Sequence, residues 1–129
     1  MTQEEKELLL KDLCARLPYG VRYRHFAWDD ERGEECVAAQ IYSINSDGYV
    51  KNCYDDETDY IDNVRPYLFP LSSMTDKQKD EYQYITERWM NDPAYSISDS
   101  IDWLNKNHFD YRSLIEKGLA IDATGLNIY

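Results

Sequence analysis

The first twenty residues carry hydrophobic side chains at helical spacing. Leu9 and Leu13 stand four residues apart, within a run of leucines that forms one apolar stripe along a helix. Thr2 followed by Glu5 has the spacing of a capping box, in which each side chain satisfies the free backbone N–H of the other residue. The pattern predicts a helix over residues 3–17.

The next segment has the alternation and the β-branched and aromatic bias of strands. Asp47-Gly48 is a hairpin signal, because this pair accepts the positive φ of a tight turn. Ile44 falls out of phase with the preceding alternation, which predicts a bulge near Tyr42 or Ser43. We expect a short edge strand or a turn at residues 61–64. The predicted strands are residues 21–28, 36–44 and 49–54.

Helical spacing returns in the second half of the chain. Thr75, followed three residues later by a glutamine, opens a helix that should continue through Met90. Ser96 should start a third helix, and Asp110 should cap a short fourth one. Residues 119–121 are hydrophobic and could dock as a terminal strand.

These elements predict a single α+β domain over residues 1–129. Its parts are an N-terminal helix, a small antiparallel sheet of three to four strands that can curl towards a barrel, and a C-terminal helical hairpin packed on the sheet. The chain has no apolar run of the length that a membrane helix needs. Three cysteines without C-x-x-C spacing and an acidic first turn favour the cytoplasm.

Charge is distributed very unevenly. The chain holds 25 acidic and 14 basic side chains, a formal net charge of −11. Residues 29–62 contain eleven acids and two bases, so this segment carries −9 and the rest of the chain carries −2. Such a balance disfavours direct nucleic-acid binding. It predicts a negative face that binds a protein with a basic surface, and the candidate binding residues are Asp29, Asp30, Glu31, Glu34, Glu35, Asp55, Asp56, Glu57, Asp59 and Asp62. The alternative is that these acids are solvated turn residues that discourage edge-to-edge aggregation.

Four blocks of the sequence stand out: Leu8–Val21, Ile44–Val50, Ile61–Thr75 and Asp102–Ala120. They resemble a group of short, uncharacterised proteins from phages and prophages of gut Bacteroides-type bacteria. The resemblance implies an origin in a mobile element and a site of action in the cytoplasm of the bacterial host. It implies no activity and assigns no catalytic residue. Residues 22–40 and 79–97 lie outside the resemblance.

Signals for catalysis or metal binding are weak. His108 and Asp110 are close enough in sequence for a general base and its partner, but no catalytic motif accompanies them. The acidic run from residue 55 fails the calcium-loop pattern, because Tyr60 stands where that loop needs glycine. A zinc site built from His25, His108 and two of the cysteines, Cys36 and Cys53, lacks ligand spacing. We therefore expect no enzyme activity, cofactor or metal.

The leading hypothesis is a non-enzymatic protein-binding module, such as an inhibitor or a nucleic-acid mimic that acts on a host protein. The oligomeric state is not predicted. A second hypothesis assigns a nucleotide-like anion to Arg22, Arg24 and Tyr23, because two arginines on one strand can grip a phosphate.

Overall fold

The computed structural model describes all residues from 1 to 129 and begins with helix α1 (Gln3–Arg16). The capping box is formed as predicted, with the Thr2 hydroxyl accepting from the backbone N–H of Glu5 and the Glu5 carboxylate accepting from that of Thr2. Leu9 and Leu13 are completely buried, so the predicted stripe is the face that packs on the core.

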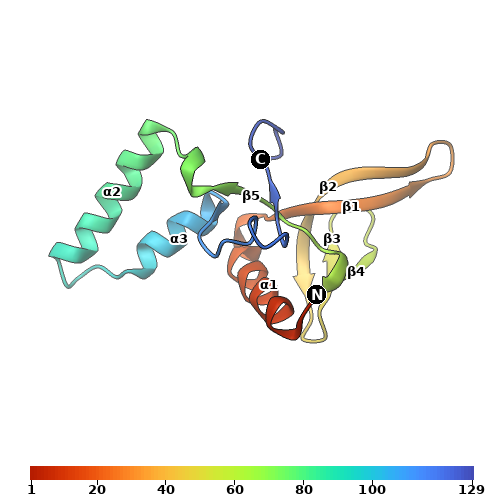
Figure 1. Ribbon diagram of the computed structural model, residues 1–129, viewed down its shortest axis with the longest axis horizontal. Helices are drawn as coiled ribbons and strands as arrows, with labels where there is room; N and C mark the ends of the chain where they lie inside the picture. The colour runs from red at the N-terminus through yellow and green to blue at the C-terminus, as the bar shows by residue number, and fades with distance from the viewer.

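A four-stranded antiparallel sheet forms one end of the molecule, with the strands in the order of the sequence (Figure 1). The sheet curls into a half-barrel. The predicted bulge is confirmed, because the register of the β2–β3 pair shifts between Ile41 and Ser43. The strands are β1 (Arg22–Asp29), β2 (Gly33–Ile44), β3 (Tyr49–Asn52) and β4 (Thr58–Tyr60).

Strand β1 separates two environments by its alternation. Tyr23, His25 and Ala27 point to the buried inner face of the half-barrel, whereas Phe26 and Trp28 are exposed on the other face. The inner face packs with α1 around one core, which includes Leu9, Leu13, Val21, Tyr23, Ala39, Ile41, Val50, Ile61, Val64, Leu68 and Leu114.

A second, three-stranded sheet lies beside the core and consists of short parallel pairs. Strand β5 (Tyr67–Pro70) lies between β6 (Phe109–Asp110) and β7 (Ile121–Asp122). The terminal strand expected at residues 119–121 is therefore formed one to two residues later. Residues Ile61–Asn63 form a turn of 3-10 helix, which decides between the strand and the turn expected there.

Helices α2 (Asp76–Asn91) and α3 (Ser98–Lys106) contact one another and project away from the sheet (Figure 1). The prediction that a helical hairpin packs on the sheet is not confirmed, because α3 contacts β6 and α1 instead. No residue of α2 is fully buried. None of the helices combines the length and the apolar composition that crossing a bilayer requires.

Two predictions about helix starts are wrong. The third helix begins at Ser98 rather than at Ser96, with Ile97 at its N-cap. The fourth helix is absent: the Asp110 carboxylate accepts hydrogen bonds from the backbone N–H groups of Leu114 and Ile115 at 3.0 and 2.9 Å, and these hold a series of turns. Aspartate can satisfy free N–H groups in turns as well as at helix starts.

Candidate functional site

His25 lies between two carboxylates at the mouth of the half-barrel. Its Nδ1 atom is 2.6 Å from Oδ2 of Asp59 in β4, and its Nε2 atom is 2.8 Å from Oδ2 of Asp55 in the β3–β4 connection. The His25 residue is only 3% exposed. A ring that faces a carboxylate on each side is best satisfied as an imidazolium, which donates from both nitrogens.

Tyr23 and Asn52 support this arrangement from the buried face. The Tyr23 hydroxyl donates to Asp59 Oδ2 at 2.5 Å and accepts from Asn52 Nδ2 at 3.0 Å. Asn52 Oδ1 accepts from the backbone N–H groups of Tyr54 and Asp55 at 2.9 and 3.0 Å, which fixes the start of the β3–β4 connection. We call Tyr23, His25, Asn52, Asp55 and Asp59 the His25 network.

Ionisation in the network follows from these contacts. Burial alone would lower the pKa of His25, but hydrogen bonds to Asp55 and Asp59, together with their charges, outweigh it and raise the pKa above the usual 6.5. Burial alone would raise the pKa of Asp55. Hydrogen bonds from His25 and from the Glu57 N–H outweigh burial, so the pKa of Asp55 is lowered. Burial, then the bond to Asp59, raises the pKa of Tyr23.

The network joins two strands that share no backbone pairing. In the sheet order β1 and β4 are the two edges, and His25 bridges them through side chains alone. Because both ring nitrogens are occupied, His25 offers no free lone pair to accept a proton from a substrate. The contacts of His25 with Asp55 and Asp59 therefore close the half-barrel, and we call them the latch. The latch carries a net charge of −1 when His25 is protonated.

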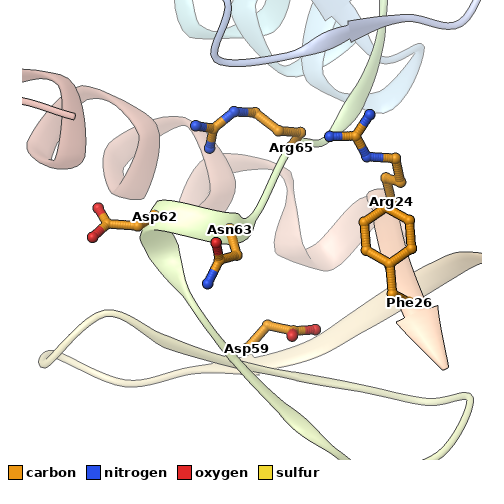
Figure 2. Close-up of a pocket in the computed structure, with 6 residues that line it drawn as sticks. All are labelled: Arg24, Phe26, Asp59, Asp62, Asn63 and Arg65. Carbon is orange, nitrogen blue, oxygen red and sulfur yellow. The ribbon is translucent and has the colours of Figure 1, made fainter. Parts of the chain in front are cut away.

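Two hollows flank the latch. One, of about 400 Å³, is lined by Arg24 and Arg65 on one side and by Asp59 on the opposite side (Figure 2). The other, of about 420 Å³, is lined by Asp59 and Glu57 with the exposed ring of Trp28. Both hollows include Phe26 and Asp59, so they lie next to each other along the edge of β1 that faces away from β2. We call this edge the outer side of β1.

The predicted acidic residues lie on the four-stranded sheet and its connections, except Asp62, which lies in the 3-10 turn after β4. They do not play equal parts. Asp55 and Asp59 are bound to His25, and Asp62 Oδ1 lies 3.6 Å from Lys6 Nζ. Asp56 accepts from the Tyr42 hydroxyl. In this group Glu57 keeps an exposed side chain that forms no ion pair.

The other acids form a group at the tip of the β1–β2 hairpin. Asp29 Oδ1 accepts from the backbone N–H groups of the turn, and Asp30 Oδ1 accepts from Trp28 Nε1 at 3.1 Å. Glu31 and Glu34 are exposed. Glu35 lies partly buried on the same strand. The acidic face thus consists of the hairpin tip and the 55–62 segment, with the two hollows beside them.

The structure does not bring Arg22, Arg24 and Tyr23 together. Tyr23 is buried on the inner face, and Arg22 Nη1 donates to the carbonyl of Ala38 at 2.9 Å. Arg24 stands near Arg65 instead, in the first hollow. Tyr23 therefore lies on the opposite face of β1 from the two arginines, because adjacent residues of a strand point to opposite faces.

His108 and Asp110 do not form a catalytic pair. The His108 ring stacks on Tyr129 with centroids 3.6 Å apart, and burial together with the charge of Arg16 lowers its pKa to about 4. The Asp110 carboxylate is occupied by backbone N–H groups. No group of three or more histidine, cysteine or acidic side chains has an arrangement suited to a metal ion.

A second charged cluster lies on the buried face of α1, to which Asp12 and Arg16 belong. Arg16 Nε lies 2.8 Å from Asp12 Oδ2, and Arg16 Nη2 donates to the carbonyl of Phe109 at 2.6 Å. Arg112 Nη1 reaches the other oxygen of Asp12 at 3.1 Å. The side chains of Asp12 and Arg16 are completely buried, so this cluster holds α1 to the C-terminal segment.

Several residues of the site were not predicted from the sequence. Phe26, Trp28 and Arg65 line the hollows, and Asn52 orders the loop. One signal for His25 was available: it stands at an inward position of a strand, where a polar side chain needs a partner.

The chain matches no protein-family model, and neither a curated protein nor a solved structure is found to be similar to it. Its function must therefore be inferred from the geometry of this site.

Proposed function

We propose that this protein is a non-enzymatic binding module, of mobile-element origin, whose acidic sheet binds a host protein with a basic surface. The observation that carries the proposal is the pair of hollows at the outer side of β1, where carboxylates of the 55–62 segment lie beside exposed aromatic rings.

Charge and shape support this assignment together. The segment from residue 29 to residue 62 carries eleven acids and two bases, and it forms one end of the molecule (Figure 1). Phe26 and Trp28, which precede this segment in β1, are 53% and 74% exposed. Aromatic rings beside carboxylates can hold lysine and arginine side chains, since the rings contact the aliphatic stems and the carboxylates pair with the cationic heads.

The test is a charge reversal that leaves the His25 network intact. Asp55 and Asp59 must not be changed, because their replacement would break the latch. The variant therefore replaces four other acids with lysine: Glu31, Glu34, Asp56 and Glu57. A matched control replaces four exposed acids of the projecting helices with lysine: Asp80, Glu81, Glu87 and Asp102.

Each protein is used to capture partners from a Bacteroides-type host lysate, and the captured protein is then purified for affinity measurements. We expect the native protein and the control to bind it and the sheet variant to lose about tenfold or more in affinity, with binding that weakens as salt rises. Equal binding by the sheet variant would contradict the proposal.

A second candidate function is the binding of a small anion by Arg24 and Arg65. Neither guanidinium forms an ion pair with a carboxylate, although both line the first hollow. A thermal-shift screen against nucleotides tests it, because a ligand at 100 times its dissociation constant stabilises by about 2.7 kcal/mol. A shift that disappears in Arg65→Gln supports this function, and no shift with any nucleotide excludes it.

A further inference from the structure

Strand β1 is an edge of the sheet, and only half of that edge is covered. The backbone N–H of Arg22 donates to the Tyr129 hydroxyl at 2.9 Å, and that of Arg24 donates to the carbonyl of Arg65 at 3.1 Å. Both groups therefore point away from β2. In an antiparallel pair the direction of the backbone groups alternates from one residue to the next.

The same alternation decides which groups of the second half are free. Phe26 and Trp28 stand two and four residues beyond Arg24, so their N–H and C=O groups also point away from β2. Side chains bridge β1 to the β3–β4 connection only at His25, and no strand pairs with the outer side of β1 beyond Arg24. The edge from Phe26 to Trp28 is thus an open template for another strand.

This stretch lacks two of the usual protections of an exposed edge. It contains neither proline nor lysine, and its outward side chains are aromatic. The two hollows lie beside it, and the second adds the carboxylates of Asp55, Glu57 and Asp59 to the edge. An added strand would thus find backbone partners and negative charge at the same place.

We propose that the partner binds by strand addition: an extended segment of the host protein, carrying lysine or arginine at alternate positions, pairs with β1 along Phe26–Trp28. The inference rests on the proposed function, and it specifies how the partner is held. Backbone hydrogen bonds to the edge supply affinity, and the acidic hollow selects basic side chains on one side of the added strand.

Synthetic peptides of about eight residues, alternating lysine and threonine, test this mode of binding. One peptide is unmodified, a second is N-methylated at the lysine amides and a third at the threonine amides. The three have the same charge. An added strand presents only one of the two sets of amides to β1, so one methylated peptide should lose about tenfold or more in affinity while the other stays within about threefold of the unmodified peptide.

A variant of the protein tests the same hydrogen bonds from the other side. Trp28→Pro removes an N–H that points away from β2, and Trp28→Val removes the ring but keeps that N–H. We expect Trp28→Pro to bind the unmodified peptide more weakly than Trp28→Val does. Circular dichroism and the denaturation midpoint of each variant show whether the hairpin is still folded. If Trp28→Pro is unfolded, protection of the Phe26 and Trp28 amides from hydrogen exchange in the native complex replaces it as the test.

The outcomes separate this inference from the proposed function. If both methylated peptides bind as well as the unmodified one, while the four-lysine sheet variant binds none, the acidic surface is the binding site and strand addition is wrong. If no peptide binds but the captured host protein still requires the acids, strand addition is again wrong. If the acids make no difference to either ligand, both proposals fail.

Discussion

Two charged clusters in this small protein have opposite designs. Beneath α1, the carboxylate of Asp12 lies between the guanidinium groups of Arg16 and Arg112, and the Asp12–Arg16 pair is completely buried. At the sheet mouth, the cation of His25 lies between the carboxylates of Asp55 and Asp59, which keep side-chain exposures of 25% and 28%.

The two clusters differ in burial, and burial decides whether a charged group can only stabilise the fold or can also face a partner. The Asp12–Arg16 pair has no access to solvent and the partners in its cluster are all parts of this chain, so the cluster acts on the fold alone. The His25 network uses one buried cation to hold two carboxylates at a surface that carries further acids. It therefore stabilises the half-barrel and also contributes negative charge to the proposed binding edge.

The largest effect is expected from breaking the buried cluster. Asp12→Ala leaves the Arg16 guanidinium in the core without a counter-charge, and we expect the free energy of unfolding to fall by about 3–5 kcal/mol. Chemical denaturation measures this loss. Asp102→Ala, at an exposed site on α3, is the control and should stay within about 0.5 kcal/mol of the native protein. A loss below about 1 kcal/mol for Asp12→Ala would mean that water reaches Arg16.

A smaller loss is expected at the latch. His25→Gln removes the cation between two carboxylates, so the carboxylates repel one another and the bridge between β1 and β4 weakens. We expect the free energy of unfolding to fall by about 1–3 kcal/mol, less than for Asp12→Ala because solvent reaches Asp55 and Asp59. Equal or larger destabilisation by His25→Gln would reverse the ranking of the two clusters.

The pH dependence of stability should show the two histidines acting in opposite directions. The folded-state pKa of His25 lies above its unfolded value of 6.5, so its contribution is complete below pH 6.5 and is lost as the pH rises through the folded pKa. The folded-state pKa of His108 is about 4, so between pH 6.5 and pH 4 the unfolded state binds the extra proton and stability falls as the pH falls.

Single substitutions show which histidine causes each of these two changes of stability with pH. In denaturation curves collected from pH 4 to above the folded-state pKa of His25, His25→Gln should flatten the decline at higher pH and leave in place the acid-side decline that His108 causes. His108→Asn should reduce the decline on the acid side, and asparagine suits the positive φ of 62° at this position. If either substitution alters the opposite side of the profile instead, the ionisation states assigned to the two sites are wrong.

The smallest stability effect is expected from the exposed acids. Glu57→Lys changes a side chain that forms no ion pair, so the free energy of unfolding should change by no more than about 0.5 kcal/mol. The affinity of the Glu57→Lys variant for a lysine-bearing peptide should nevertheless fall, because Glu57 lines the hollow beside Trp28. A large loss of stability with unchanged binding would give Glu57 the structural role that we assign to Asp55.

Local signals in the sequence predicted the local structure well. Both capping boxes and the bulge after Ile41 depend on residues close in the chain, and all three are present. The short parallel pairs of β5 with β6 and β7 were not predicted as a sheet, because they join two-residue segments far apart in sequence. The amphipathic pattern of α2 predicted a helix but could not specify the surface it faces.

The site was predicted only in outline. The concentration of acids on the sheet follows directly from the sequence, but Asp55 and Asp59 were interpreted as free surface charges. Their partner, His25, lies about thirty residues away, and only the curl of the sheet brings the three side chains together. The hollow with Arg24 likewise depends on Arg65, which comes from a different part of the chain.

The most direct test of the central claim is an NMR titration of the isotopically labelled protein with the unmodified lysine–threonine peptide. We expect amide shifts and new exchange protection to be concentrated at Phe26, Trp28 and Glu57. Shifts concentrated on α2 and α3, or no shifts at all, would contradict the claim that the acidic edge of the sheet is the binding site.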